Sequence, residues 1–592
     1  MTKAVLEAES EGAARRSVAA SPSAASAIPP SLHASLMARL DRLGPAKEVA
    51  QIGAAIGREF SHALLAAVVR AETDLDAALN RLIGSGLLFR QGTPLHASYF
   101  FKHALVQNAA YSTLLRESRR SLHARIADIL ETKFPDLVES RPELLAHHCT
   151  EAGLIEKAAG LWGKAGQRSL DRSAMVEAAA QLTRALDGLS TLPSTPAVRR
   201  DQIKLQVALV TPLLHTKGYA APETKAATER AGQLIDQTEA LGEPLEDPLL
   251  RFSVLYADWV ANYQSFNGSA MRKLAGQFLA LAEKQGNTAP RLVGNRIVGI
   301  SLLCTADIAP SVAHFDRAIA LYEPAEHRPL AGRFGHDARV APLSYRSWAL
   351  WMLGYPAASI EDAERALKDA REIGQAATLA YAIAHASIAR MLCGNYAIAA
   401  AEAQQLVALA EEKGVRFWKP YGTILQGCVS ALAGNASDAV KMMTSGMTAY
   451  QSSGSNAWMP WFLSHLACAY AELHRFDDAC RCIREALAAA ETTQERWYEA
   501  EIHRIAGQIV LRSLEPETTK AETRFLRALA VAHEQQAKSW ELRAAMSMAR
   551  LWHDQGKRQQ AQDLLAPVYG WFTEGFDTLD LKEAKVLLDE LR

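Results

Sequence analysis

The sequence lacks the features that mark several large classes of protein. Its 7 cysteines are scattered without a C-x-x-C pair, so neither a disulfide framework nor a zinc ribbon fits, and a reducing cytoplasm is the expected compartment. No uncharged apolar run reaches the roughly 18–20 residues that a membrane-spanning helix needs. Neither sign of charge is in excess, with 64 Lys and Arg against 65 Asp and Glu. A chain that binds nucleic acid along its whole length is therefore not expected, because such binding depends on a basic surface.

Catalytic signatures are also missing from the sequence. There is no G-x-S-x-G elbow, no H-E-x-x-H helix and no phosphate loop of the form G-x-x-x-x-G-K-[ST]. The pairs Gly163–Lys164 and Gly556–Lys557 are followed by Ala and Arg and lie within helical repeat sequence. The consecutive residues His147–Cys149 point in different directions on a helix, so they cannot converge on one metal ion. We expect a protein that is not an enzyme and has no cofactor and no metal site.

The length of the chain predicts several domains or a repeat array. Its 592 residues exceed the roughly 250–300 residues at which a single core stops growing. Residues 1–30 contain an Ala/Ser-rich tract without an apolar core, which is typical of a disordered leader rather than a signal peptide. We divide the remainder into a small domain at 31–125, irregular helical repeats at 126–350 and regular repeats at 351–592.

A period of 40 residues dominates the last part of the chain. Turn residues recur at this step, apart from one step of 42 residues between His474 and Pro516. Small residues follow them by five positions, and a second series of turn residues runs in parallel. The three series are Gly354, Gly394, Gly434, His474, Pro516 and Gly556; Ser359, Ala399, Ala439, Ala479, Ala521 and Ala561; and Gly374, Gly414, Gly454 and Gln494. Helix axes about 8–10 Å apart leave room only for small side chains at the crossing. The register therefore predicts an α-solenoid of TPR-like helix pairs.

Four tryptophans follow nearly the same step, each near the start of a predicted helix. They are Trp418, Trp458, Trp497 and Trp540. One interpretation is a ladder of core aromatic side chains between repeats. The other is an aromatic lining of a concave groove that binds a peptide or another ligand. Repetition alone does not separate the two interpretations.

Residues 31–125 have a different pattern, in which helical segments precede two short extended runs. The helical segments are 32–43, 46–56, 62–69 and 74–83, and the extended runs are 87–90 and 99–101, with Gly92 and Pro94 between them. Helices followed by a hairpin predict a small winged-helix domain in front of the solenoid. The helix at 74–83 is the one that would enter a DNA groove. It carries Asp74 and Asp76, which would face phosphates, and Arg81 is its only basic side chain, so DNA reading is disfavoured.

Several distinctive segments are spread along the chain. They are Ile28–Leu32, Met37–Leu43, Phe101–Gln107, Glu143–His148, Thr216–Tyr219, Gln536–Arg543, Val568–Phe572 and Gly575–Thr578. Through them, residues 28–592 resemble the region after the NTPase core of bacterial multidomain signalling ATPases of the STAND or AAA type. These proteins are often fused to class III adenylate or guanylate cyclases. The resemblance implies a winged helix and TPR-like repeats, whereas the phosphate loop and the paired Asp motif of a cyclase are not recognisable in this chain.

The resemblance also implies one nucleotide-sensing residue and a class of partner. In related signalling NTPases, a winged-helix histidine at the position of His103 contacts the β-phosphate of ADP; the alternative is a histidine that caps or packs locally. We expect a cytoplasmic scaffold that docks an NTPase or cyclase–NTPase partner through the winged helix. Its solenoid would bind a protein or a small ligand, and no membrane is expected as a partner. The alternatives are a transcription regulator that binds DNA through the winged helix, and a catalytic ATPase or adenylate cyclase. The second alternative rests on similarity only and is disfavoured by the missing phosphate loop.

Overall fold

The computed structural model describes residues 30–93, 97–172, 174–218, 221–243, 245, 247–415 and 417–592. The expected leader, up to Pro29, and also Pro94 and Tyr219 lie outside the described residues. Contacts divide the chain into unit 1, Met1–Leu154, and unit 2, Ile155–Arg592, and each unit is considered by itself. In the described part of the chain, no helix has both the length and the apolar character that a membrane crossing requires.

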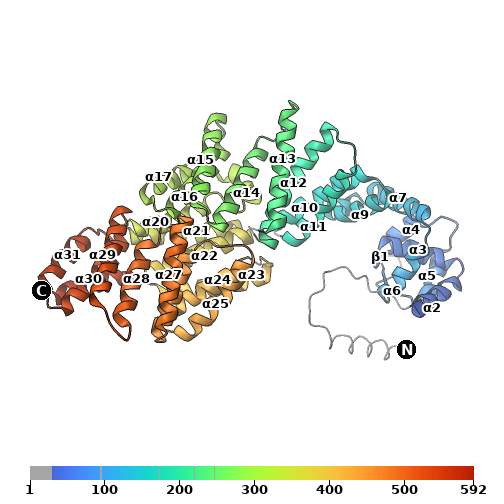
Figure 1. The fold of residues 1–592 in the computed structure, drawn as a ribbon. Coiled ribbons are helices and arrows are strands. Elements are labelled where there is room, and N and C mark those ends of the chain that lie inside the picture. The colour runs from blue at the N-terminus through green and yellow to red at the C-terminus, as the bar shows by residue number, and fades with distance from the viewer. Residues whose placement is uncertain are drawn as a thin grey trace. The chain divides into compact units, whose positions relative to one another are not determined.

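Unit 1 combines helices with a small antiparallel sheet (Figure 1). Its elements are α2 (Pro30–Asp41), α3 (Ala46–Ile56), β1 (Glu59–Ser61), α4 (His62–Val68), α5 (Leu75–Gly84), β2 (Leu88–Gln91), β3 (Ser98–Phe101), α6 (Ala104–Ser112), α7 (Arg116–Lys133), α8 (Pro135–Ser140) and α9 (Pro142–Ala152). The strand order is β1-β3-β2. The expected antiparallel pairing of the two extended runs is confirmed, with Phe89 opposite Phe100. Strand β1 was not expected, because three residues are too few to show an alternating pattern.

Local sequence explains where the helices of unit 1 begin. The Ser61 side chain accepts a hydrogen bond from the Leu64 amide at the start of α4, and Asp74 accepts one from Ala77 at the start of α5. Both are N-caps that satisfy amides without a partner inside the helix. Helix α7 contacts α3 and α4 as well as α9. For this reason unit 1 extends to Leu154. The domain boundary at residue 125 was predicted from the sequence and stays a prediction.

Unit 2 is an α-solenoid in which successive helices are antiparallel neighbours. Its elements are α10 (Ile155–Asp171), α11 (Met175–Ser190), α12 (Pro196–Lys217), α13 (Pro222–Ala240), α14 (Leu249–Ser265), α15 (Gly268–Gln285), α16 (Thr288–Cys304), α17 (Ile308–Ala320), α18 (Pro324–His327), η2 (Arg328–Leu330), α19 (Ala331–Phe334), α20 (Val340–Met352), α21 (Pro356–Ile373), α22 (Ala376–Leu392), α23 (Tyr396–Lys413), α24 (Trp418–Leu432), α25 (Ala436–Ser452), α26 (Met459–Glu472), α27 (Phe476–Thr493), α28 (Glu499–Arg512), α29 (Thr518–Glu534), α30 (Lys538–Asp554), α31 (Arg558–Gly570) and α32 (Leu579–Glu590). The predicted mainly α, TPR-like solenoid is therefore present.

The predicted 40-residue register is confirmed in every repeat from α20 onward. The first series of turn residues separates the two helices of each pair, from Gly354 between α20 and α21 to Gly556 between α30 and α31. All six residues five positions later are 0 % exposed, as small side chains at a helix crossing must be. His474 has a φ of 57° and Gln494 a φ of 63°, so the left-handed backbone is kept at positions where other repeats have glycine.

Two turn glycines are also required by a close approach of the carboxyl-terminal segment. A Cβ on Gly354 would lie 2.4 Å from the Trp571 ring, and a Cβ on Gly394 would lie 2.5 Å from the Leu579 Cβ. Both glycines have a positive φ, 93° and 81°. These turns therefore form the surface on which residues after α31 pack.

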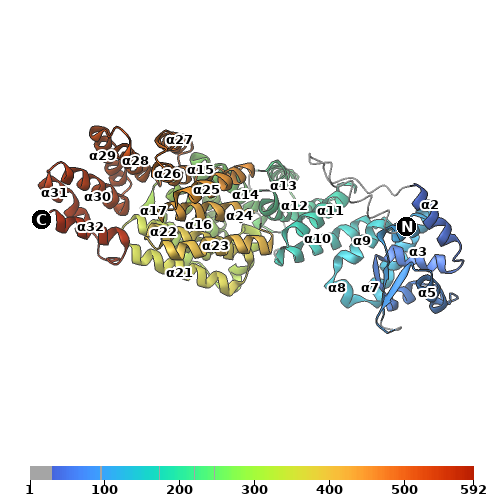
Figure 2. The same cartoon turned by 90° about the horizontal axis from the view of Figure 1, so that it is seen from below.

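Helices of unit 2 that are far apart in the sequence contact one another at their ends. The carbonyl of Gln264, near the end of α14, accepts hydrogen bonds from the amides of Asn456 at 2.7 Å and Ala457 at 3.0 Å. The carbonyl of Cys304, the last residue of α16, accepts one from the Arg496 amide at 3.0 Å. In the view of Figure 2, α24 and α25 overlap α14 and α16, and the hydrogen bond between the Tyr450 hydroxyl and the Gln264 side chain shows that α25 and α14 meet at their ends.

The same arrangement continues toward the carboxyl end. The carbonyl of Trp351, near the end of α20, accepts a hydrogen bond from the Ser539 hydroxyl, 188 residues later in the chain. The carbonyl of Leu392, the last residue of α22, accepts one from Arg543 Nη2 at 2.9 Å. Carbonyls at the end of a helix have no partner within that helix. We call these contacts of Gln264, Cys304, Trp351 and Leu392 the inner seam.

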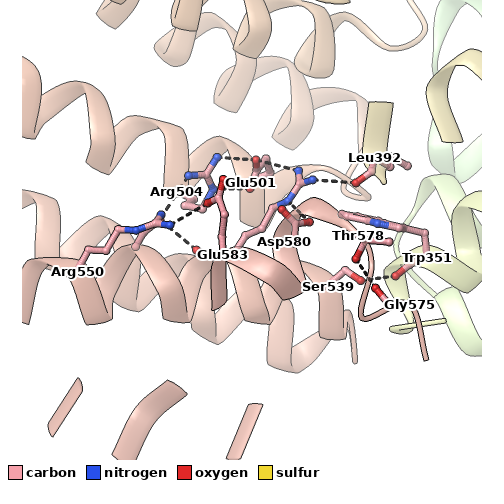
Figure 3. A network of polar contacts seen from close by, with 12 residues as sticks. Trp351, Leu392, Glu501, Arg504, Ser539, Arg550, Gly575, Thr578, Asp580 and Glu583 are labelled. Atoms are coloured by element: carbon pink, nitrogen blue, oxygen red, sulfur yellow. Dashed lines mark hydrogen bonds and ion pairs between the residues drawn. The ribbon is translucent and has the colours of Figure 1, made fainter. Parts of the chain in front are cut away.

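Arg543 connects the inner seam to the last helix through Leu392, Glu501 and Asp580, which are labelled in Figure 3. Its guanidinium donates to Asp580 of α32 at 2.8 Å and lies 3.5 Å from a Glu501 oxygen. Glu501 is 3 % exposed and accepts two hydrogen bonds from Arg504 at 2.7 Å. The guanidinium carbon of Arg543 also lies 4.9 Å from the ring centre of Trp351. These contacts link α32 to α28 and α30. Removing one partner of such a buried charge network would leave the other charges uncompensated, so the network holds the three helices together.

The helix crossing at Ala479 provides a test of the register. Replacing Ala479 by Leu should overpack a position that is 0 % exposed and lower the free energy of unfolding by roughly 1–3 kcal/mol. The matched control is Ala488→Leu, an exposed position on the same helix, where we expect a change within about 0.5 kcal/mol. Urea denaturation followed by circular dichroism measures both variants. Equal stability of the two variants would contradict the assigned crossing.

The left-handed turn at Ala306 provides a second test. Ala306 has a φ of 72° and lies between α16 and α17. A left-handed backbone costs a non-glycine residue roughly 1–2 kcal/mol, so Ala306→Gly should raise the free energy of unfolding by about 0.5–1 kcal/mol after the entropy cost of glycine. Ala280→Gly, on the exposed side of α15, should instead lower it by about 1 kcal/mol. A loss of stability in both variants would argue against a strained turn.

Candidate functional site

The inner face of unit 2 contains a pocket of about 50 Å³ with predominantly aromatic walls. Its lining comes from α14, α16, α20, α22, α24 and α25, together with residues just before α20, α24 and α26. Aromatic side chains include Trp259, Tyr345, Tyr381, Trp418 and Trp458. Because they come from several repeats, the pocket exists only when these repeats are stacked in register.

Helical spacing explains how each helix supplies more than one wall residue. Tyr381 and His385 are four residues apart on α22 and therefore lie on the same face; their ring centres are 4.0 Å apart. On α14, Trp259 and Tyr263 are also four residues apart, with ring centres separated by 5.4 Å. Aromatic pairs at such distances add stability beyond the burial of their area. The side chains of the pocket walls thus pack against one another without a ligand.

Four polar side chains that line the pocket have a buried atom without a hydrogen-bond partner in the described part of the chain. These atoms are Arg296 Nε, His336 Nε2, His385 Nε2 and Trp418 Nε1. All four residues are at most 8 % exposed. An unsatisfied buried donor or acceptor costs about 1–3 kcal/mol, so each of these atoms is suited to a bound group.

The tautomer of His385 follows from its surroundings. Its Nδ1 lies 2.8 Å from the Tyr381 carbonyl oxygen, which can only accept a hydrogen bond, so Nδ1 carries the proton. Burial lowers the pKa of His385 to about 3, which keeps the ring neutral at physiological pH. Its Nε2 therefore presents a lone pair, and hence a hydrogen-bond acceptor, among the residues that line the pocket.

Trp458 joins the pocket to the inner seam through an unusual backbone conformation. Its φ of 69° is left-handed, and its amide donates a hydrogen bond to Glu495 Oε2 at 2.9 Å. Glu495 also accepts one from Trp497 Nε1 at 3.2 Å. Glu495 is 0 % exposed, and burial raises the pKa of its carboxyl to about 8. A strained residue held by a buried carboxyl beside a pocket is typical of functional sites.

The four tryptophans singled out in the sequence occupy two places. All are at most 3 % exposed. Trp418 and Trp458 line the pocket. Trp497 and Trp540 pack near the inner seam, where Trp540 Nε1 donates to the Trp497 carbonyl at 3.1 Å and the Trp540 ring lies 4.5 Å from that of Trp351.

Sequence reasoning missed the polar residues of the pocket. Arg296 and His336 lie upstream of the regular repeats, where no periodicity marks them. His385 lies in the uncharged stretch from Gln375 to Ala389. The available signal was the spacing of Tyr381 and His385, which places two ring side chains on one face of a helix.

In unit 1, His103 is exposed and sits at the N-cap position of α6 without a side-chain capping hydrogen bond. The neighbouring Lys102 is also exposed. Strand β3 buries Tyr99 and Phe101 and leaves Phe100 half-buried. Phe89 on β2 is 48 % exposed and stacks on Phe100, with ring centres 5.1 Å apart.

The remaining histidine cluster in unit 1 is hydrogen-bonded internally. His123 Nδ1 lies 2.8 Å from His148 Nδ1, and His123 Nε2 lies 2.9 Å from the Tyr111 hydroxyl. Burial lowers the pKa of His123 to about 4 and that of His148 to about 3. In the described parts of both units, no group of three or more His, Cys, Asp or Glu side chains could hold a metal ion.

The raised pKa of Glu495 predicts a pH-dependent stability. A carboxyl with a pKa of about 8 in the folded chain, against 4.5 ordinarily, stays protonated on folding, so its contribution to stability is lost as pH rises from about 5 to 8. Glu495→Gln should lose one hydrogen bond, which costs roughly 1–3 kcal/mol. The glutamine side chain does not titrate, so the stability of the variant lacks this dependence on pH. The difference in unfolding free energy between parent and variant should therefore narrow from pH 5 to 8. A constant difference, as expected for Glu485→Gln at an exposed site, would contradict the assignment.

Comparisons with known proteins give one curated relative, and no protein-family model matches the chain. An uncharacterized protein of Rhizobium meliloti (strain 1021) is 24 % identical over 541 residues, which is 91 % of this chain and 51 % of that protein. The chain thus spans about half the length of the curated relative it matches.

Among solved structures, a Rap protein complexed with competence and sporulation factor is 13 % identical, with a TM-score of 0.47 over 64 % of this chain and 99 % of that one. The Cut9–Hcn1 structure is 16 % identical, with a TM-score of 0.40 over 81 % of this chain and 80 % of that one. A STAND protein with a tetratricopeptide repeat sensor from Pyrococcus horikoshii is 12 % identical. It has a TM-score of 0.29 and covers 96 % of this chain and 68 % of that one.

Proposed function

We propose that the chain is a non-catalytic signalling scaffold. Unit 1 docks an NTPase or a cyclase–NTPase partner, and unit 2 binds a protein or a small ligand. The observation that carries the docking half is the stacked aromatic pair of the exposed Phe89 and the half-buried Phe100, beside the exposed Lys102 and His103. We call these four residues the docking face.

The order of elements in unit 1 supports a winged-helix fold. Helices α3, α4 and α5 precede the antiparallel pair β2 and β3, and β1 joins the sheet from between α3 and α4. The resemblance to signalling ATPases led us to expect a winged helix here. His103 lies two residues after the end of β3 and is the N-cap residue of α6, so its ring and the first amides of the helix can share one anion.

The chemistry of the docking face favours a protein partner that carries a phosphate. The exposed Phe89, stacked on the half-buried Phe100, supplies apolar contact area at little cost in side-chain entropy. Lys102 and His103 supply hydrogen-bond donors at its edge, and Arg90 on β2 is exposed as well. An NTPase domain loaded with ADP combines an apolar surface with a β-phosphate.

A DNA-reading function is not favoured by the exposed face of α5. Asp74 and Asp76 are exposed at its start, where they would face phosphates. Arg81 donates a hydrogen bond to the Leu43 carbonyl at 3.2 Å, so the basic side chain of this helix is already engaged. Asn80 alone does not supply an array that could read bases.

The aromatic pocket supports the ligand-binding half of the proposal. Unpartnered polar atoms in a mostly apolar pocket are typical of small-molecule sites. We also place the protein in the cytoplasm, because no disulfide links any of its seven cysteines, all of which lie in the described ranges.

The docking proposal is tested with an NTPase domain from the resembled signalling ATPases, supplied in trans with and without ADP. Phe89→Ser should weaken binding by about tenfold or more in both states, since an aromatic anchor is lost. His103→Ala should remove only the ADP-dependent gain, because a charge-assisted hydrogen bond to phosphate contributes about 1.5–3 kcal/mol, or roughly 10–150-fold. Calorimetry measures the affinities.

The matched control for docking is Leu115→Ser. Leu115 is 77 % exposed and lies at the start of α7 rather than on the docking face, so binding should be unchanged. If all three variants bind like the parent, unit 1 does not use this face. If His103→Ala keeps the ADP dependence, His103 is a local structural residue.

A further inference from the structure

We propose that the aromatic pocket of unit 2 is a binding site for a small carboxylate anion, held by Arg296. This inference rests on the ligand-binding half of the proposed function and specifies the chemistry of that ligand. It is carried by a buried guanidinium without a counter-charge and by unpartnered hydrogen-bonding atoms that line the same pocket.

Arg296 is buried without an acidic partner among the residues that the structure describes. It is 1 % exposed, and it forms no ion pair with any acidic side chain in the described ranges. Its Nη1 and Nη2 lie 3.4 Å and 3.3 Å from the carbonyl oxygens of His336 and Phe334, which are long for charged hydrogen bonds. Its Nε has no partner. A buried charge is retained only when something offsets its loss of hydration.

The aromatic surroundings compensate the guanidinium only in part. Its carbon lies 5.1 Å from the Tyr256 ring centre, and a contact of this kind is worth about 0.5–2 kcal/mol. The cost of moving a cation out of water is several kcal/mol after relaxation. An anion in the pocket would supply the missing compensation.

The other polar atoms suit the two oxygens of a carboxylate. Trp418 Nε1 is a donor only and has no acceptor. His336 Nε2 also lacks a partner, and its ring centre lies 6.2 Å from that of Trp418. Arg296 and Trp418 can therefore donate to a carboxylate, while the lone pair of His385 Nε2 can accept a hydrogen bond from a water or from a hydroxyl on the ligand.

The volume of the pocket limits the size of the ligand. About 50 Å³ corresponds to roughly three to five water positions at 10–15 Å³ each. That space admits a carboxylate of a few heavy atoms and excludes a nucleotide or a folded peptide. In these low-dielectric surroundings the attraction between Arg296 and an anion is stronger than in bulk water.

The test uses the full chain with acetate as the probe and acetamide as its neutral isostere. Binding is measured by calorimetry and by the ligand-dependent rise in melting temperature, at constant ionic strength set with sodium chloride. We expect the dissociation constant for acetate to be at least tenfold lower than that for acetamide. Equal binding of the two probes, or no binding of acetate beyond chloride, would overturn the proposal.

Two variants and one control variant, Arg317→Met, connect the binding to named residues. Arg296→Met should reduce acetate affinity by tenfold or more while leaving the melting temperature without acetate unchanged or raised, because it removes an uncompensated buried charge. Trp418→Phe keeps the aromatic wall and removes one donor, so it should weaken acetate binding severalfold. Arg317→Met, at an exposed position of α17, should bind acetate like the parent.

The outcomes separate this proposal from the docking function. Retention of acetate binding by Arg296→Met would show that the anion binds elsewhere and would overturn the pocket assignment. Loss of acetate binding in Arg317→Met would do the same. The docking experiment on unit 1 uses neither Arg296 nor acetate, so either proposal can fail while the other stands.

Discussion

The carbonyl groups at the ends of α14, α16, α20 and α22 have no partner within their own helices, and much of unit 2 depends on the distant residues that bind them. The Trp351 carbonyl of α20 accepts a bond from the nearby Gly354 amide as well. Each of the four carbonyls accepts a hydrogen bond from a residue well over a hundred positions later in the chain. These bonds bring the ends of early and late helices together. A face that would otherwise be an open groove is filled with aromatic rings.

The buried environment accounts for the ionisation states observed on the inner face. Burial keeps His385 neutral and Glu495 protonated at ordinary pH. Arg296 cannot respond in this way, because a guanidinium does not lose its proton in proteins. The same desolvation that neutralises its neighbours therefore leaves Arg296 as the charged group of the pocket. A single positive charge among neutral side chains favours an anionic ligand over a neutral one.

The sequence allowed the repeat register to be predicted because each repeat is a local unit. Turn residues such as Gly434 and small residues such as Ala439 report only on contacts within a helix pair, so their spacing is sufficient. The helices of unit 1 and its β2–β3 pairing were predictable for the same reason. The inner seam joins positions such as Cys304 and Arg496 through their backbone groups. Every residue has these groups, so the residue types at the two positions do not reveal the contact. The pocket was missed because it is assembled by that seam.

The inner seam also limits how this solenoid can change in evolution. An open repeat array can gain or lose a helix pair, because each repeat contacts only its neighbours. Here the repeats between Gln264 and Asn456 must bring the Asn456 amide back to the Gln264 carbonyl. Insertion of one more pair of helices within that interval would shift every later residue past its carbonyl partner and separate the walls of the pocket. Because the other bonds of the inner seam extend to Arg543, duplication is tolerated only outside the stretch from Gln264 to Arg543, and the number of repeats inside that stretch is set by these bonds.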